Sequence, residues 1–219
     1  MSVNKLTNPY PVKCLFAGES GTGKTTLIRL IVKGEQGEVP EPTIGMAFSV
    51  KTVQMTNADG TLQLARSQNW DAAGSPRFRS IVTSYMRELD IAFLVFDMNK
   101  RETWEELVRW KKQIDEINEN SPLPQYVIIG NKSDIHKYQV DDYEIQEKCR
   151  EWNCKRYILS CVESNSVGMA NRMYCQSILE LHKYLLKCEK LPERFKPGFK
   201  KEFFQIMDDS KQTQCCSVQ

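Results

Sequence analysis

Short apolar runs rich in branched and aromatic residues alternate along the chain with longer stretches whose apolar positions recur every three or four residues. Six runs have the length and composition of β-strands, at residues 12–18, 47–55, 61–70, 91–98, 126–131 and 156–161. Five stretches have helical spacing, at residues 24–33, 77–89, 102–119, 141–152 and 170–186. This alternation predicts an α/β fold.

The connections between the runs predict how the strands pair. The segment "TNADGT" between the second and third runs has the Asp-Gly chemistry of a hairpin, whereas the other strands are separated by stretches of helix length. We therefore expect a six-stranded, mostly parallel sheet with one antiparallel edge strand, flanked by five helices. After Lys187 the periodicity is lost and two prolines follow, which predicts one domain over 1–187 and a flexible tail over 188–219.

Composition narrows the class of protein. The chain is 41% hydrophobic and 26% charged, with a formal charge of +2, and no apolar run is long enough to span a membrane. The N-terminus lacks the apolar core of a signal peptide, so we expect a protein that begins in the cytosol and binds no nucleic acid. Six of the eight cysteines are interpreted as small apolar residues, and His136 and His182 as structural.

The clearest chemical motif is "GESGTGKT", at Gly18–Thr25, which follows the first strand and opens a helix. It fits a phosphate-binding loop whose backbone N–H groups face an anion, with Lys24 as a point charge and the Thr25 hydroxyl directed at Mg2+. A glycine-rich turn without a ligand is the alternative. The residues expected to contact the phosphates are Glu19, Ser20, Gly21, Thr22, Gly23, Lys24, Thr25 and Thr26.

The tetrapeptide "NKSD", Asn131–Asp134, follows another strand at the same edge of the sheet. The two oxygens of Asp134 match the adjacent N1–H and amino donors of guanine, whereas adenine has no such pair. Alone the motif is typical of a surface turn. Together with the phosphate loop it predicts a guanine-nucleotide site. The phosphate loop alone would also allow a P-loop nucleotide kinase, and "NKSD" together with "TIG" and "DAAG" counts against that alternative.

The ordered set "GESGTGKT", "TIGMAF", "WDAAG", "NKSD" and "LSCVES" resembles the five nucleotide-binding motifs of small Ras-like GTPases over residues 12–186. The segments "IGMAF", "RFRSI" and "LVFDMNKRETW" are most similar to Rab proteins. The resemblance implies a P-loop small GTPase fold with GTP or GDP and Mg2+ as cofactors. It implies Mg2+ ligands at Thr25, at Thr43 in the GTP state and, through water, at Asp71. It also implies phosphate binding by Gly74 and base contacts from Asn131, Lys132, Asp134, Ser160, Cys161 and Val162.

Departures from the family pattern affect hydrolysis and release. Ser75 stands where the family has a glutamine that positions the attacking water, and Pro76 removes a backbone donor, so we expect slow intrinsic hydrolysis. Lys24 and Gly74 complete the candidate catalytic set. Gln36 stands near the position where the family usually has an aromatic residue that packs on guanine. Val162 replaces the lysine that is usual in the family. Fewer base contacts predict fast nucleotide release.

Two further features concern partners. Phe48, Trp70 and Tyr85 match the aromatic triad that Rab proteins present to effectors, and core packing is an equally open interpretation. The terminal "QCCSVQ" fits a C-a-a-X site. Cys216 would be farnesylated, or Cys215 and Cys216 geranylgeranylated by the Rab prenylation machinery, and an unmodified polar tail is the alternative.

We therefore expect a monomeric membrane-traffic switch that recruits effectors in the GTP form. It would work with an exchange factor and a TBC-type activating protein, on the cytoplasmic face of intracellular membranes, cycling with the cytosol. A non-switching, GTP-bound scaffold is the main alternative, because Ser75 replaces the usual glutamine.

Overall fold

A single mixed sheet organises the chain, of which the computed structural model describes residues 8–37, 40–56, 62–122, 124–188 and 191–196. The strand order is β2-β3-β1-β4-β5-β6. Only β2 and β3 pair antiparallel among the described strands, so the predicted sheet with one antiparallel edge strand is confirmed. The strands are β1 (Tyr10–Ala17), β2 (Met46–Thr56), β3 (Leu62–Ala72), β4 (Ile91–Asp97), β5 (Gln125–Asn131) and β6 (Lys155–Ile158).

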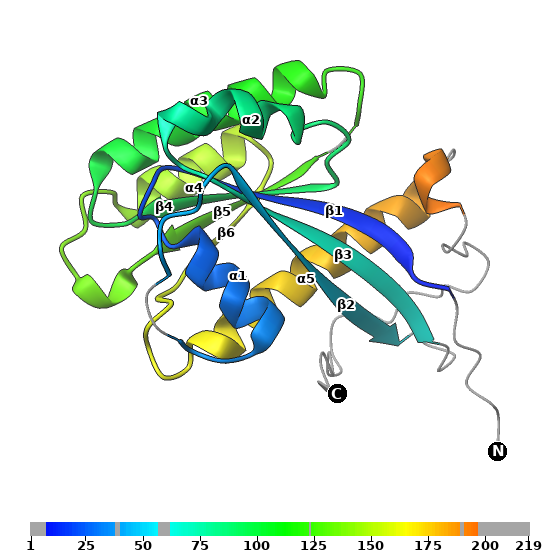
Figure 1. Cartoon of the computed structure of the whole chain (residues 1–219), viewed down its shortest axis with the longest axis horizontal. Coiled ribbons are helices and arrows are strands. Elements are labelled where there is room, and N and C mark those ends of the chain that lie inside the picture. Colours follow the sequence, from blue (N-terminus) through cyan, green and yellow to red (C-terminus); the bar gives the residue numbers. More distant parts are fainter. Residues whose placement is uncertain (1–7, 38–39, 57–61, 123, 189–190, 197–219) are drawn as a thin grey trace.

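Helices cover both faces of this sheet. In Figure 1, α1 and α5 lie on one face, and α2 and α3 lie on the other. The five α-helices that the structure describes are α1 (Lys24–Lys33), α2 (Arg79–Ser84), α3 (Arg101–Ile117), α4 (Asp142–Glu151) and α5 (Ser166–Lys187). Short 3-10 turns are η1 (Pro76–Phe78), η2 (Ser133–Ile135) and η3 (Glu193–Phe195).

Two apolar cores hold the layers together. One packs β1 and β4 side chains against α1 and α5, where the rings of Phe16 and Phe93 stack at 4.5 Å beside Tyr174. The other packs the opposite face against α3 and α4. Every residue of β4 is buried, as expected for a central strand covered on both faces. The buried sheet gives the loops at its carboxyl edge a rigid base.

Element boundaries differ from the prediction mainly at three places, one of which is the start of α5, at Ser166 instead of residue 170. The helix expected over 77–89 is a 3-10 turn followed by the six-residue α2, which ends at Ser84. Beyond it the buried Met86 accepts a hydrogen bond from the Asn118 side chain at 2.7 Å, and Glu88 adopts a positive φ of 54°, which is incompatible with a continuing helix. Strand β6 ends at Ile158, three residues before the predicted end. Residues 159–161 leave the strand to form a loop in which the Cys161 amide binds the Asn131 side chain.

The segment after α5 returns to the sheet. Phe195 is fully buried and meets the ring of Tyr10 edge-on, at 6.0 Å between centroids. Arg194 forms an ion pair with Asp90, whose side chain is 1% exposed. Helix α5 ends at Lys187, and residues 191–196, which the prediction places in the tail, pack against β1.

Candidate functional site

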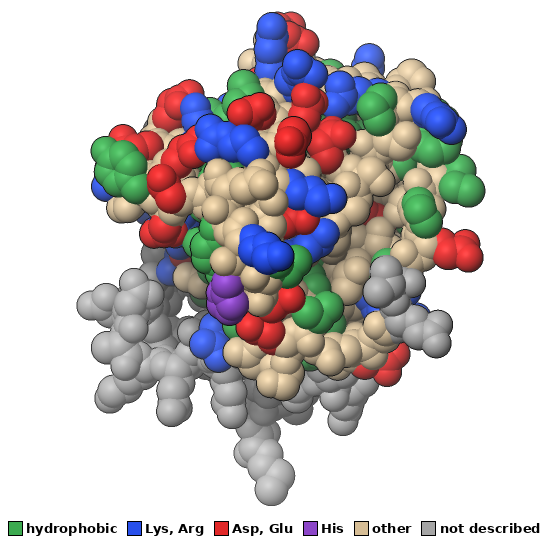
Figure 2. Space-filling model, turned by 90° about the vertical axis from the view of Figure 1, so that its left-hand side faces the viewer, with side chains coloured by type: hydrophobic (Ala, Val, Ile, Leu, Met, Phe, Trp, Pro, Cys, Tyr) green, Lys and Arg blue, Asp and Glu red, His purple; other side chains and the backbone are tan. Residues whose placement is uncertain are grey.

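A cavity of about 850 Å³ opens at the carboxyl edge of the parallel strands. Its walls come from the phosphate loop, from residues 36–37, 40–44 and 72–78, and from the loops after β5 and β6. Figure 2 shows the molecule from this side, with positive and negative side chains interspersed and no extended basic surface on that face. Ligands of open α/β sheets bind at this edge, so the fold brings the predicted motifs to one place.

The loop between β1 and α1 depends on glycine at its closest contact. Gly23 has a φ of 97°, and a Cβ there would lie 2.1 Å from the Asn131 side-chain nitrogen. That nitrogen donates to the Thr22 carbonyl at 2.8 Å. The phosphate loop and the "NKSD" loop are therefore joined directly, and the free N–H groups at the start of α1 face the cavity where an anion is favoured.

Lys24 lies beneath this loop. Its Nζ donates to the carbonyl oxygens of Gly18 and Glu19, at 2.8 Å each. Burial lowers the pKa of Lys24 to about 8, against the opposing effect of the Asp71 and Glu19 carboxylates. A buried ammonium whose proton is this weakly held would be stabilised by an anion, so the arrangement suits phosphate.

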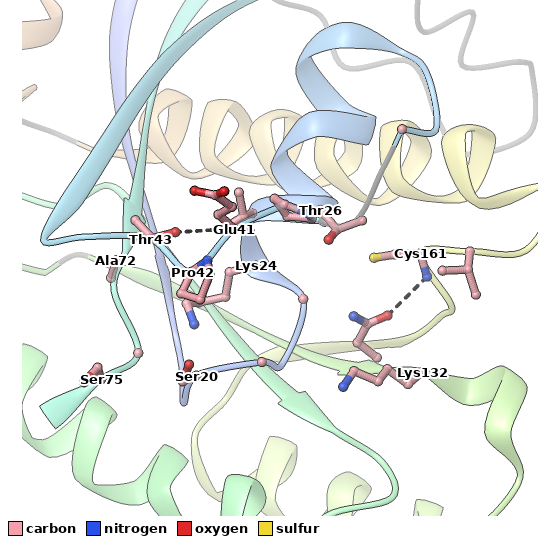
Figure 3. A pocket seen from close by; sticks show the side chains of 18 of the residues that line it. Ser20, Lys24, Thr26, Glu41, Pro42, Thr43, Ala72, Ser75, Lys132 and Cys161 are labelled. Carbon is pink, nitrogen blue, oxygen red and sulfur yellow. Dashed lines mark hydrogen bonds between the residues drawn. The ribbon is translucent and has the colours of Figure 1, made fainter.

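Three oxygen-bearing side chains converge beside Lys24. Thr25 Oγ1 donates to Asp71 Oδ2 at 2.6 Å and lies 2.9 Å from Thr43 Oγ1, and the Thr43 hydroxyl lies 3.4 Å from the same carboxylate oxygen. Figure 3 shows Thr43 and Lys24 at this end of the cavity. In an octahedral Mg2+ site with bond lengths of about 2.1 Å, neighbouring ligands are about 3 Å apart. The spacing of the two hydroxyls therefore fits that ion.

Asp71 also has unused binding capacity. Its Oδ1 is buried and has no hydrogen-bond partner in the described part of the chain. Burial raises the pKa of Asp71, although Thr25 and Lys24 partly offset this effect. A cation near the carboxylate would remove the cost of the unpaired oxygen, which supports a metal site here.

The segment after β3 packs directly on the phosphate loop. A Cβ at Gly74 would lie 2.3 Å from the backbone of Glu19 and Ser20, so only glycine fits there. Ser75 follows, half-buried at the cavity wall and at the start of η1. Figure 3 shows Ser75 on the same side of the cavity as Ser20. The residue at the family's glutamine position is therefore next to the phosphate loop but carries a single hydroxyl.

A polar network that the sequence analysis missed fixes the start of α2. Arg79 Nη2 lies 3.1 Å from Glu19 Oε1 and 3.0 Å from Glu106 Oε2, and its guanidinium lies over the Trp110 ring. Trp110 Nε1 also donates to Glu19 at 3.2 Å. The segment "RFRSI" contained Arg79, but no local pattern pointed to its distant partners.

The other end of the cavity carries the predicted base-reading residues. The Asn131 side chain accepts a hydrogen bond from the Cys161 amide at 3.2 Å, which is the dashed line that ends at Cys161 in Figure 3. Asp134 Oδ1 is buried and lacks a partner among the described residues. Because an unpaired buried carboxylate oxygen is costly, Asp134 is available for a ligand with adjacent N–H donors. Ser160 is fully buried in the same loop, and Val162 is exposed.

Lys132 is held from the end of β4. Its Nζ lies 2.8 Å from Asp97 Oδ2, and Asn99 Nδ2 donates to its carbonyl at 2.9 Å. Burial raises the pKa of Asp97, but the hydrogen bonds from Lys132 and Asn99 outweigh this effect and lower the pKa below its usual value. Sequence reasoning assigned no role to Asp97 or Asn99, which follow β4 without a recognised motif.

Gln36 contacts the loop that follows β6. Its Nε2 donates to the Glu163 carbonyl at 2.5 Å and lies 2.8 Å from Ser166 Oγ. The residue lines the cavity, near the place expected from the sequence. It supplies no ring to stack on a base, but it does connect residues 34–37 to the start of α5.

The three aromatic residues interpreted as an effector surface form one cluster. Phe48 and Trp70 have centroids 4.7 Å apart, and Trp70 and Tyr85 have centroids 4.8 Å apart. Phe48 remains 52% exposed. The rings therefore pack on one another and also face solvent. The candidate lipidation sites, Cys215 and Cys216, lie outside the described residues.

The two histidines differ in burial. His182 is buried with its Nδ1 3.0 Å from the Tyr10 hydroxyl, and His136 lies at the surface near Tyr138. Among the described residues, no helix combines the length and apolarity needed to cross a bilayer.

Comparison with known proteins gives consistent matches. The sequence profile of the Ras family matches residues 13–180, from β1 into α5, which includes every segment that lines the cavity. Ras-related protein Rab-25 of Canis lupus familiaris is 37% identical over 162 residues, which cover 74% of this chain and 73% of that protein. GTP-binding protein ypt4 of Schizosaccharomyces pombe is 33% identical over 177 residues, covering 79% and 71%. Ras-related protein YPTC6 of Chlamydomonas reinhardtii is 29% identical over 181 residues, covering 81% and 78%.

Proposed function

Because the chain belongs to the Ras family of small GTPases, with Rab proteins among its relatives, we propose that it is a Rab-like switch of vesicle traffic. The switch binds GTP and GDP with Mg2+ and recruits effectors to membranes in its GTP form. One observation carries the proposal. Asp71 and Asp134 each have a buried carboxylate oxygen without a hydrogen-bond partner among the described residues. Asp134 lines the cavity in the base-reading motif, and Asp71 binds Thr25, which lines the same cavity and whose hydroxyl lies at Mg2+ spacing from that of Thr43.

At the phosphate end, the phosphate-loop amides and Lys24 hold the phosphates. The hydroxyls of Thr25 and Thr43 and the carboxylate of Asp71, the last through water, hold Mg2+. Bound there, Mg2+ neutralises phosphate charge. The Gly74 N–H donates to the terminal phosphate, and this backbone bond is the means by which residues 74–84 respond to that phosphate.

At the base end, each side chain has a separate task. Asp134 accepts from guanine N1–H and the amino group, while the Cys161 amide donates to the base oxygen. Lys132, positioned by Asp97, lies along the base, and Asn131 fixes the loop by its bonds to Thr22 and Cys161. Adenine would leave the Asp134 carboxylate unpaired, so it is excluded by an energetic cost rather than by shape.

Hydrolysis is slow because the chain lacks a side chain that positions water. The Ser75 hydroxyl is shorter than a glutamine amide by two heavy-atom links and lacks its paired donor and acceptor. Pro76 restricts the same turn. A constitutively GTP-bound scaffold is the second candidate, and the replacement at position 75 favours it. A TBC-type activating protein that brings its own glutamine and arginine would restore turnover.

The nucleotide itself tests this proposal. The purified full-length chain is denatured, its nucleotide is identified by chromatography, and GTP-loaded protein is followed for conversion to GDP. We expect guanine nucleotide with slow conversion. Persistent GTP would favour the scaffold, and an adenine nucleotide would contradict both. Lys24→Met should lose the nucleotide and serves as the control for retention in this cavity.

Membrane attachment belongs to the same proposal. Geranylgeranyl groups on Cys215 and Cys216 would anchor the chain, because one lipid gives only marginal binding and a second makes it stable. In cells, Cys215→Ser should weaken membrane retention, and the double Cys215→Ser, Cys216→Ser form should be cytosolic while it still binds GTP. Wild-type fractionation of the double variant, or a native tail without prenyl groups, would refute lipid anchoring.

A further inference from the structure

Helix α4 ends in a turn that brings two cysteines together. The Cys154 amide donates to the Cys149 carbonyl at 2.9 Å, and the Asn153 amide donates to the Arg150 carbonyl at 3.3 Å. Asn153 has a φ of 46°. This pair of bonds around a left-handed residue is the Schellman motif, which frequently brings the side chains at these two positions together, and here the two thiols are hydrogen-bonded.

Both cysteines belong to the apolar core beneath α3, between α4 and β6 (Figure 1). Cys149 is 7% exposed, and Cys154 is partly exposed, so the pair can be reached from the Cys154 side. Both are free thiols. A leucine or alanine would satisfy the apolar contact of the motif equally well, so packing alone does not require two sulfur atoms here.

The two thiols differ in acidity. The hydrogen bond that the Cys154 thiol makes to Cys149 lowers the pKa of Cys149, and the charge of Arg156 acts in the same direction, against burial and the charge of Asp142. The same hydrogen bond and burial raise the pKa of Cys154, against the opposing charge of Lys111 on α3. The contact therefore makes the Cys149 thiol more acidic than that of its partner Cys154.

We propose that Cys149 and Cys154 form a redox-active pair that a peroxide converts into an intramolecular disulfide. The Cys149 thiolate attacks one oxygen of hydrogen peroxide, breaks the O–O bond and becomes a sulfenic acid, with hydroxide as the leaving group. Cys154 then attacks the oxidised sulfur, the S–O bond breaks, and water leaves with the thiol proton. The sum is two thiols and one peroxide giving one disulfide and two waters.

Two other buried cysteines, Cys14 and Cys161, have raised rather than lowered pKa values. Burial raises the pKa of Cys14 above its usual range and that of Cys161 to about 12. Redox-sensitive cysteines are those with a lowered pKa and a nearby resolving thiol, so oxidation should be selective for the α4–β6 turn. The pair lies away from the phosphate loop, and the inference holds whatever nucleotide the chain binds.

Peptide mapping tests the linkage directly. Full-length chain, kept with GDP and Mg2+, is treated with hydrogen peroxide, blocked with N-ethylmaleimide and cleaved with trypsin. We expect residues 149–150 linked to residues 151–155, with release of the two peptides by dithiothreitol. Peroxide that oxidises other thiols without forming this link would overturn the proposal.

Single variants separate chemistry from packing. Cys154→Ala should leave Cys149 as a sulfenic acid that dimedone traps, whereas Cys149→Ala should leave Cys154 reduced. Cys188→Ser, outside the turn, should form the disulfide as wild type does. Arg156→Gln keeps both thiols but removes a positive charge that lowers the pKa of Cys149. In this variant, the pH at which Cys149 is half-alkylated by iodoacetamide should therefore rise. Equal alkylation profiles for wild type, Arg156→Gln and Cys154→Ala would contradict the coupling.

Discussion

Arg79 and Glu19 lie 3.1 Å apart across the junction between the start of α2 and the phosphate loop. The same guanidinium reaches Glu106 on α3, so one side chain joins three elements that are distant in the sequence. Since Gly74 already packs on the backbone of the phosphate loop, the segment between Gly74 and Arg79 is fixed at both ends. Ser75 lies within that segment, and its position relative to the phosphates depends on both contacts.

Replacing Arg79 with methionine should release this segment. The change removes two partly exposed ion pairs and the contact with the Trp110 ring, so we expect a loss of about 1 kcal/mol in the free energy of unfolding by urea. Hydrogen exchange over residues 74–84 should also accelerate. Arg87→Met, on an exposed side chain, is the matched control. Unchanged exchange in Arg79→Met would show that Arg79 does not hold the segment.

The lowered pKa of Lys24 predicts a pH dependence of nucleotide binding. The free chain loses the Lys24 proton near pH 8, and bound phosphates would raise that pKa toward its usual 10.5, so binding takes up a proton between these values. Affinity for GDP with Mg2+ should be about fourfold weaker at about pH 8.5 than at about pH 7. Because the unfolded chain binds more protons in this window, the free protein should become more stable as the pH rises through it.

Calorimetry in buffers of different ionisation enthalpy measures the proton uptake. The control variant Lys33→Met, at the exposed end of α1, should show the same pH dependence of GDP affinity as wild type. Binding without proton uptake at about pH 8.5 would contradict the account of Lys24.

Ser75→Gln should accelerate intrinsic hydrolysis, on the order of tenfold, if placement of water limits the rate. The longer side chain starts from the cavity wall beside the phosphate loop and carries both a donor and an acceptor. Release of phosphate in a single turnover measures the effect. Ser75→Ala should stay within about twofold of wild type. No acceleration by glutamine would mean that another feature, such as Pro76, controls the rate.

Two substitutions of Gln36 should change nucleotide release in opposite directions. Gln36→Ala removes the bonds to Glu163 and Ser166, and loss of about 1 kcal/mol would make release about fivefold faster. Gln36→Phe should slow release, because a ring can lean on the base. Dissociation of fluorescent GDP measures both. Equal rates in all three forms would contradict the role given to this position.

Sequence patterns were sufficient to predict those elements and site residues whose signal comes from neighbouring residues in the chain. Strand β4 is an unbroken apolar run, and α1 ends at Gly34 with a positive φ, so both boundaries follow from nearby residues. The phosphate loop and Asp134 could also be nominated as candidate binding groups from the sequence, because short motifs carry their chemistry. The predicted helix over 77–89 was wrong beyond residue 84, since the apolar spacing continues through Met86 and Leu89, which are buried outside the helix.

Long-range contacts had no local signal. Arg79 with Glu19 and Gln36 with Ser166 join residues far apart along the chain, and nothing beside any of them indicates a partner. The packing of Phe195 on Tyr10 likewise depends on the fold of the whole sheet. Such contacts could be identified only after the strand order had placed the elements.

The central claim is that Asp134 reads guanine, and exchanging its acceptor for an amide tests this most directly. Asparagine offers one acceptor and one donor, which matches the N1–H and C2 carbonyl of xanthine instead of the two donors of guanine. Competition binding with Mg2+ measures the affinities of wild type and Asp134→Asn for GDP, XDP and ADP. We predict that wild type prefers GDP over XDP by ~100-fold or more and that Asp134→Asn reverses the preference. Equal binding of ADP and GDP by wild type, or an unchanged preference in the variant, would contradict the claim.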